Sequence, residues 1–175
     1  WVKRHCAEIS GDAGRIAVAG DSAGGNIAAA LAHVAAGDRA VVHQLLFYPA
    51  LDGRCATASY DAGYAGFLSA AQMRWYWDQY APGDVRLDPR ASVAEADIPA
   101  GLAPATIITA GHDPLHDEGV AYADALTKAG LAAALHDYPA AIHGFASLIG
   151  MVRLADEAVA IGCEALKRAF AKAAL

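Results

Sequence analysis

Cysteine is scarce in this sequence, and the few present follow no metal or disulfide pattern. Cys6, Cys55 and Cys163 are the only three among 175 residues, and none belongs to a Cys-x-x-Cys arrangement. An odd, widely spaced set indicates neither a disulfide framework nor a zinc site. We therefore expect a reducing, cytoplasmic location and no metal ligands among these residues.

Charged residues and long apolar runs are also few. Charged residues make up 18% of the chain, and acidic ones outnumber basic ones to give a formal net charge of −6, which argues against a nucleic-acid surface. No apolar run reaches the roughly 18 residues of a membrane span, and no basic-then-apolar leader follows Trp1. The 56% of hydrophobic residues instead predict a single globular domain with a substantial core.

Strand-like apolar runs alternate with helical patterns along the chain. The runs cover residues 16–19, 41–48 and 106–110, with a weaker one at 131–138, and helices are predicted at 23–36 and 115–129. This alternation predicts an α/β fold with a mostly parallel sheet flanked by helices. A last helix has an apolar stripe that fits packing on the sheet and a homodimer interface equally well: Leu154, Val159, Cys163, Leu166 and Phe170.

Residues from about 52 to 100 interrupt this alternation. They contain loop-like sequence and one compact aromatic helix, AAQMRWYWDQY, at residues 70–80. We therefore predict one domain over residues 1–175, with residues 52–100 forming a cap-related insertion above the sheet. Four side chains recur at helical spacing in the aromatic helix, which fits a packing face and a pocket lining equally well: Met73, Tyr76, Trp77 and Tyr80.

A glycine-rich corner joins the first strand-like run to the helix after it. Its sequence, Gly20-Asp21-Ser22-Ala23-Gly24, is a Gly-x-Ser-x-Gly pattern between a strand and a helix. In a nucleophile elbow of this kind the serine takes a strained backbone conformation, and small neighbours let the strand and the helix approach closely. A turn that only packs, or that cradles a phosphate, is the alternative, but the lysine of a P-loop and the spacing of a dinucleotide turn are both missing. The serine is therefore a candidate nucleophile.

A serine nucleophile needs a base that accepts its proton and an acid that orients the base. His5 is the only histidine before the elbow. We therefore expect both partners of the serine to follow the elbow in the sequence. Asp113 follows the third strand-like run and His143 follows the fourth, which gives the order serine, acid, histidine. Asp113 also precedes Pro114 and could serve only as a helix cap, and the rival acid Asp117 suits compensation of the helix dipole better.

The other histidines that follow the elbow are poorer candidates for the base. His33 falls within a predicted helix, and His43 and His136 fall within predicted strands. His112 and His116 are too close to the candidate acid in sequence to face the serine through it. This leaves His143 as the predicted base.

Five segments together resemble the hormone-sensitive-lipase-like, or GDXG, carboxylesterases of the α/β-hydrolase superfamily: GDSAGGN, YPALD, DPRAS, DPLHDEG and HGF. The resemblance extends over the whole chain and implies an α/β-hydrolase fold. It places the nucleophile on Ser22, the acid on Asp113, the base on His143 and an oxyanion-binding backbone N–H on Ala23. It also implies hydrolysis of small carboxylic esters with short to medium acyl chains, without metal or organic cofactor. We further expect four residues in the substrate pocket: Phe67, Trp77, Ile142 and Phe145.

Two features depart from that family's pattern. Ala140 stands where the family usually has glycine, and the sequence before Gly20 lacks the upstream His-Gly-Gly-Gly segment that supplies most oxyanion donors. We therefore expect the chain to correspond to the C-terminal part of such an enzyme, without the first strands of the sheet and with an exposed apolar strand edge and helix face. Loss of a single donor costs about 10²–10³ in turnover. The alternatives to an active esterase are a catalytically impaired fragment and a non-catalytic small-molecule-binding relative.

Overall fold

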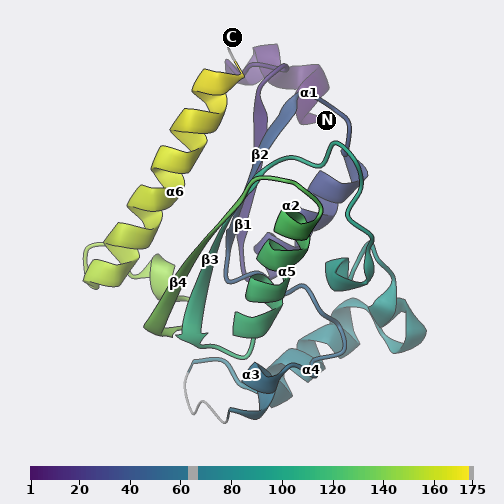
Figure 1. Cartoon of the computed structure of the whole chain (residues 1–175), viewed down its shortest axis with the longest axis vertical. Coiled ribbons are helices and arrows are strands. Elements are labelled where there is room, and N and C mark those ends of the chain that lie inside the picture. The colour runs from purple at the N-terminus through teal and green to yellow at the C-terminus, as the bar shows by residue number, and fades with distance from the viewer. Residues whose placement is uncertain (63–66, 174–175) are drawn as a thin grey trace.

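A four-stranded parallel sheet forms the centre of the computed structural model, which describes residues 1–62 and 67–173. The strands follow the order β1-β2-β3-β4 across the sheet (Figure 1). All four lie where the apolar runs predict them, and β4 extends beyond its predicted end at residue 138. Their bounds are β1 Ile16–Asp21, β2 Val41–Phe47, β3 Ala105–His112 and β4 Ala133–Ile142.

Helices cover both faces of the sheet. Helices α2 (Ala23–Val34) and α5 (His116–Lys128) lie on one face, and α6 (Arg153–Lys172) lies on the other (Figure 1). Neighbouring residues of β2 point to opposite faces, because side chains alternate along a strand. Leu46 packs in the core under α2 and α5, whereas Leu45 packs in the core under α6.

Helix α6 approaches the sheet through small residues. Its buried positions are Ala155, Ala158, Gly162 and Ala165. A Cβ atom at Gly162 would lie 3.0 Å from Cδ2 of Leu45, so the absence of a side chain permits the close packing. Three members of the predicted stripe, Leu154, Val159 and Leu166, pack on the same core, while Cys163 is exposed. Packing on the sheet therefore accounts for these three residues of the stripe, and a homodimer stays a prediction.

The segment between β2 and β3 contains short helices and no strand among its described residues. They are α3 (Ala58–Asp61), α4 (Ala70–Tyr80) and the 3₁₀ helices Gly83–Leu87 and Val93–Glu95. Figure 1 shows α3 and α4 beyond the carboxyl ends of the strands. Residues 63–66 of the predicted insertion, and 174–175 at the end of the domain, lie outside the described residues. The bounds of the insertion stay a prediction.

Helix α4 is held at its start by a capping box and along its length by an apolar core. The Ser69 side chain accepts from the backbone N–H of Gln72, whose side chain accepts from the backbone N–H of Ser69. Met73 and Trp77 then pack in a core that also contains Leu115, next to the start of α5. This second core fixes α4 over the strand ends.

One side of the molecule presents apolar surface, as the sequence predicts. Strand β1 lies at the edge of the sheet, and α2 beside it exposes Ile27, Leu31 and Val34 at successive turns. The remaining short elements are α1 (Val2–His5) and 3₁₀ turns at Cys6–Ile9 and Phe145–Ser147. Among the helices of the described residues, none has the length and apolar character needed to cross a bilayer.

Candidate active site

The backbone at Ser22 has the strained geometry that the glycine-rich corner predicts. Its φ of 53° and ψ of −118° lie in a region that residues with a side chain rarely adopt. Two backbone hydrogen bonds hold it there: Ser22 N–H donates to the Phe47 carbonyl at 2.9 Å, and Ala50 N–H donates to the Ser22 carbonyl at 3.2 Å. The end of β2 and the residues after it therefore hold the serine at the carboxyl edge of the sheet.

Close approach of strand and helix requires two of the three glycines around this corner. A Cβ at Gly20 would lie 2.2 Å from the Gly24 carbonyl oxygen, and one at Gly25 would lie 2.8 Å from Pro49 Cβ. A Cβ at Gly24 would meet nothing closer than Asp21 Oδ1, at 3.9 Å. The absence of a side chain is therefore a steric requirement at Gly20 and Gly25 and not at Gly24.

The structure brings together the three residues predicted as nucleophile, base and acid. His143 Nε2 lies 2.9 Å from Ser22 Oγ, and His143 Nδ1 lies 2.6 Å from Asp113 Oδ2. The histidine is 7% exposed and the aspartate is fully buried. This geometry lets the imidazole accept a proton from the serine while the carboxylate holds the opposite ring nitrogen.

Asp113 divides its two oxygens between the two roles that its sequence position suggests. Oδ2 faces His143, while Oδ1 accepts the backbone N–H of Leu115 at 2.9 Å in the turn before α5. The local turn contact and the contact with His143 thus coexist, because each uses a different oxygen. The turn fixes the carboxylate so that its second oxygen points at the imidazole.

Tyr48 supports the imidazole, a contact that the sequence analysis missed. Its ring centroid lies 4.8 Å from that of His143, and its φ of 34° is again in the left-handed region. Burial and the nearby charge of Asp21 raise the pKa of Tyr48 to about 12, so the phenol stays neutral. Its position directly after a buried strand was the only sequence signal.

Phe145 lies behind Tyr48. The expectation that it lines the substrate pocket is wrong. Its side chain is 2% exposed, and its ring centroid is 5.8 Å from that of Tyr48 and 5.1 Å from that of Tyr138. The residue belongs to the core under α6. The 3₁₀ turn after His143 directs it inward, which position in the sequence alone did not reveal.

A cavity of about 720 Å³ opens beside Ser22 and His143. The predicted pocket residues Phe67 and Trp77 line it, whereas Ile142 and Phe145 are not among its lining residues. Ala23, whose backbone N–H is the predicted oxyanion donor, also lines it. The aromatic face of α4 thus contributes to the cavity and, through Trp77, to the core. The remaining lining residues are Asn26, Ile27, Ala50, Leu68, Gln72, Met73, Tyr76, Gln79 and Tyr80.

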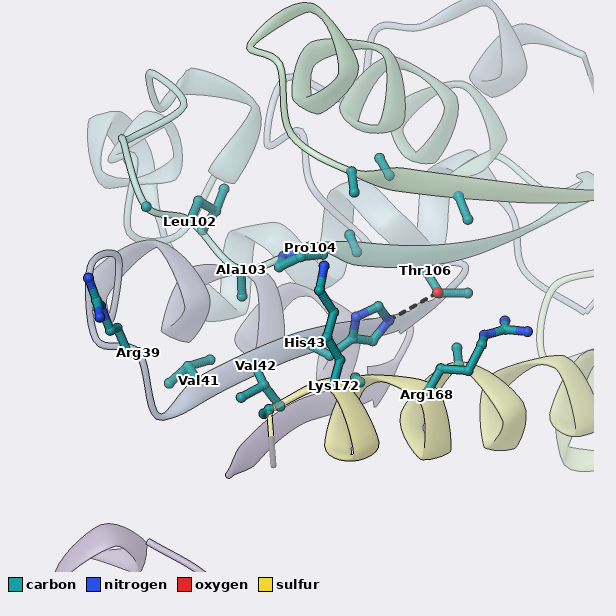
Figure 2. A pocket seen from close by; sticks show the side chains of 18 of the residues that line it. Arg39, Val41, Val42, His43, Leu102, Ala103, Pro104, Thr106, Arg168 and Lys172 are labelled. Atoms are coloured by element: carbon teal, nitrogen blue, oxygen red, sulfur yellow. Dashed lines mark hydrogen bonds between the residues drawn. The ribbon is translucent and has the colours of Figure 1, made fainter. Parts of the chain in front are cut away.

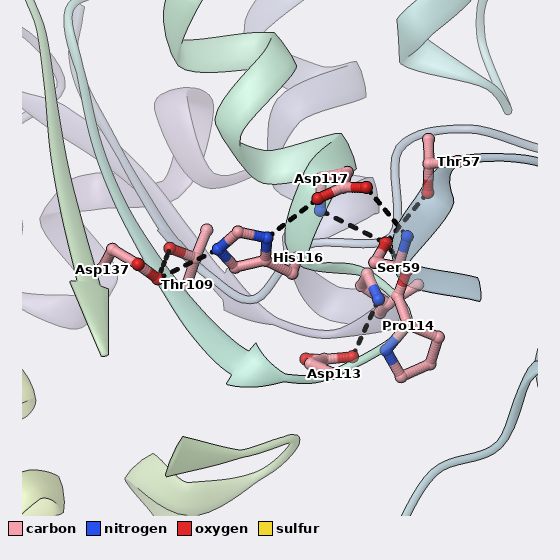
Figure 3. Close-up of polar contacts among 9 residues, drawn as sticks. Thr57, Ser59, Thr109, Asp113, Pro114, His116, Asp117 and Asp137 are labelled. Carbon is pink, nitrogen blue, oxygen red and sulfur yellow. Dashed lines mark hydrogen bonds and ion pairs between the residues drawn. The ribbon is translucent and has the colours of Figure 1, made fainter. Parts of the chain in front are cut away.

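A polar network joins the segment after β2 to the loop that carries Asp113 (Figure 3). Ser59 Oγ donates to the Pro114 carbonyl at 2.6 Å, and Ser59 N–H donates to Asp117 Oδ2 at 2.8 Å. His116 bridges Asp117 and Asp137, at 2.9 and 3.2 Å. The rival acid Asp117 is therefore engaged in this network and has no contact with His143.

The environment of Asp117 keeps it ionised. Burial acts to raise its pKa, but contacts with His116 and the Ser59 N–H outweigh that effect and hold the pKa below its ordinary value. Residues 1–62 and 67–173 contain no group of three or more His, Cys, Asp or Glu side chains that could hold a metal ion.

A serine at positive φ after a parallel strand, facing a histidine held by a buried aspartate, is the arrangement of an α/β-hydrolase. A family model described as "alpha/beta hydrolase fold" matches residues 1–147. The chain therefore belongs to the α/β-hydrolase family, and its resemblance to the hormone-sensitive-lipase-like carboxylesterases is confirmed.

Esterases are prominent among the similar proteins. The chain is 38% identical over 174 residues to ethyl acetate hydrolase of Pseudomonas putida, covering 96% of this chain and 54% of that protein. It is 40% identical over 177 residues to carboxylesterase NlhH of Mycobacterium tuberculosis, covering 97% and 55%. The crystal structure of esterase LipW from Mycobacterium marinum superposes with a TM-score of 0.89 at 36% identity, over 97% of this chain and 55% of that one. The chain thus spans about half the length of the curated relatives.

Proposed function

We propose that this protein hydrolyses carboxylic esters through an acyl-enzyme formed on Ser22. The observation that carries the proposal is the chain of contacts from Asp113 through His143 to Ser22, at 2.6 and 2.9 Å. The 2.9 Å distance between His143 and Ser22 is within the range in which a base can accept the proton of a nucleophile, and the 2.6 Å distance is that of a hydrogen bond that orients the base. The names of the similar esterases support the same reaction class.

In the proposed reaction Ser22 Oγ attacks the ester carbonyl while His143 Nε2 accepts the hydroxyl proton. The tetrahedral intermediate collapses, and His143 returns the proton to the leaving alcohol. Water then attacks the acyl-enzyme, again giving its proton to His143, and the carboxylic acid leaves as Ser22 is restored. Asp113 holds the Nδ1–H tautomer and stabilises the imidazolium throughout. Only groups of the protein and water take part.

The developing oxyanion is proposed to bind the backbone N–H of Ala23. Ala23 is the first residue of α2, where the partial positive charge of a helix N-terminus favours an anion. The residue lies in the cavity wall beside Ser22. Its position directly after the nucleophile matches the donor position of a nucleophile elbow.

The cavity favours small esters with short to medium acyl chains. Its volume of about 720 Å³ and its walls of Phe67, Trp77 and other apolar side chains provide apolar contact for such chains. The similar protein named for ethyl acetate hydrolysis acts on a substrate of this class.

The three free cysteines support the cytoplasmic location proposed from the sequence. A homodimer is a further proposal, which sedimentation velocity tests.

The test is hydrolysis of p-nitrophenyl butyrate together with labelling by a fluorophosphonate. We expect turnover and labelling on Ser22, both lost in Ser22→Ala and both retained in the control Ser10→Ala, which changes an exposed serine that does not line the cavity. Turnover that survives Ser22→Ala would overturn the assignment of the nucleophile. Absence of both label and turnover in the unmutated protein would indicate an impaired fragment or a non-catalytic relative.

A further inference from the structure

A second cavity, of about 860 Å³, lies at the amino ends of the strands, whereas Ser22 lies at their carboxyl ends. Its lining includes residues at or beside the starts of three strands, namely Val41 of β2, Ala105 of β3 and Ala133 of β4, together with the last turns of α6 (Figure 2). Strand β3 is eight residues long, so about 25 Å separates the amino ends of the strands from the catalytic carboxyl ends. The two cavities share no lining residue.

The rim and walls of this cavity are held together by hydrogen bonds to backbone carbonyls. Gly37 N–H, after α2, donates to the Gly101 carbonyl, before β3, at 3.0 Å. Both glycines have positive φ, and a Cβ at Gly101 would lie 3.1 Å from Gly37 Cα. The Gln44 side chain donates to the Ala103 carbonyl at 2.7 Å. The protein's own contacts therefore already fix the loops of the wall.

The charged groups of the cavity are mostly positive, although the protein as a whole is acidic. Arg39, Arg168 and Lys172 line it, and none of them forms an ion pair with another described residue. The one acid in the lining, Asp38, accepts from Lys3 Nζ at 2.6 Å and from the Ala40 N–H at 3.0 Å. The charge of that acid is thus already compensated, and the described lining residues have an excess of positive charge.

His43 forms a buried polar wall between the cations and β3. The residue is 8% exposed, and Nε2 lies 3.0 Å from Thr106 Oγ1 (Figure 2). Burial and the charge of Arg168 lower the pKa of His43, so the ring adds no positive charge of its own. Around it the lining is aliphatic and small, formed by Val42, Pro104, Ala132, Ala134, Ala165 and Ala169.

We propose that this cavity binds a small organic acid, with its carboxylate between Arg168 and Lys172 and its aliphatic body on the alanine and valine lining. Neither cation forms an ion pair with a described residue, although the charge of Arg168 also acts on Glu164 one turn earlier in α6. Charge-assisted hydrogen bonds to a carboxylate are the strong ones. The volume lies within the usual range for small-molecule sites, which are mostly apolar with few polar groups. A highly charged anion such as a polyphosphate would leave most of this apolar lining unused.

The test uses hexanoate as the probe and reductive methylation of lysines, followed by mass spectrometry of the peptides, as the readout. Bound hexanoate should slow methylation of Lys172 in a saturable way and leave Lys167 unaffected. Lys167 is the internal reference, because it belongs to the same helix but pairs with Glu164. This readout locates binding without any turnover, so it is independent of the proposed esterase activity.

Two arginine variants and two further probes sharpen this test. Arg168→Gln should raise the half-protecting hexanoate concentration by about tenfold, the loss of one charged hydrogen bond. The control Arg153→Gln, on the same helix but paired with Glu157, should leave it unchanged. Protection of Lys172 by 1-hexanol, equal protection by inorganic phosphate, or no protection by hexanoate would each overturn the proposal.

Discussion

Tyr60 donates a hydrogen bond of 2.7 Å to Glu118, joining the segment after β2 to helix α5 inside the protein. The same carboxylate accepts the backbone N–H groups of Leu51 and Asp52, at 2.6 and 3.0 Å. Glu118 is 3% exposed. A single buried acid, five residues after Asp113, thus holds the start of the segment that leads from β2 to the helices over the strand ends.

Stability should depend on pH through Glu118. Burial raises its pKa to about 8 in spite of the three donors, from an ordinary value of 4.5. The folded chain therefore holds this proton more tightly than the unfolded chain does. The contribution of Glu118 to the free energy of unfolding is fully present below about pH 4.5 and is lost as pH rises through about 8. In urea unfolding, we expect the free energy of unfolding to fall between pH 5 and 8.5, relative to that of Glu118→Gln.

The glutamine variant has no titrating group but can still accept and donate hydrogen bonds at this site. Glu164→Gln is the matched control, because Glu164 is exposed and its ion pair with Lys167 holds its pKa below the ordinary value. That variant should keep the pH dependence of the unmutated protein. Parallel pH curves for Glu118→Gln and the unmutated protein would contradict the prediction.

Alanine substitutions at the corner should separate the glycines that are sterically required. Gly20→Ala forces a Cβ against the Gly24 carbonyl, so it should lower the free energy of unfolding by about 3 kcal/mol, the upper range for overpacking. Gly24→Ala, in the first turn of α2, has open space and should be neutral or slightly stabilising. Thermal unfolding of both variants measures the difference. Equal stability of the two would show that the corner relaxes easily.

Asp113→Asn should reduce kcat by about 10⁴, the size seen for this change in a serine protease triad. The Asn amide oxygen can still accept the Leu115 N–H, which leaves the NH₂ group facing His143 Nδ1. The imidazole must then carry its proton on Nε2 and cannot accept one from Ser22. Steady-state hydrolysis of p-nitrophenyl butyrate measures the effect.

Asp117→Asn is the matched control for the acid. This carboxylate contacts Ser59 and His116 and not His143. We expect its loss to lower Tm while kcat stays within a few-fold of the original. A larger loss of kcat in Asp117→Asn than in Asp113→Asn would reverse the assignment of the acid.

The apolar face of α2 should limit solubility. Leu31 and Val34 are 52% and 75% exposed one turn apart, beside the edge strand β1. Replacing them with Gln and Glu should raise the concentration at which light scattering detects association, because a contiguous apolar patch is removed. The control Val85→Glu with Leu87→Gln changes two other exposed apolar residues, 58% and 44% exposed. An equal gain from the control would assign the effect to added polarity alone.

Strand and helix positions followed from the sequence because local apolar periodicity is enough to define them. The buried runs gave β1 to β3 and the glycine-bounded pattern gave α5, within a few residues. The strand-turn-helix context likewise identified Ser22 as the residue at the corner. The short 3₁₀ helices of the segment between β2 and β3 gave no periodic signal, since each is too short to show one.

Side-chain partners across the fold were decided only by the tertiary structure. Sequence order placed Asp113 and His143 after successive strands, and parallel pairing of β3 with β4 then brought the two loops to one edge. The inward turn of Phe145 and the buried role of Glu118 had no local signature, and the only signal for the support of His143 by Tyr48 was the position of Tyr48 after a buried strand. These contacts join residues far apart in the chain. A local pattern records which side chains are available, whereas packing and the burial of polar groups decide which of them meet.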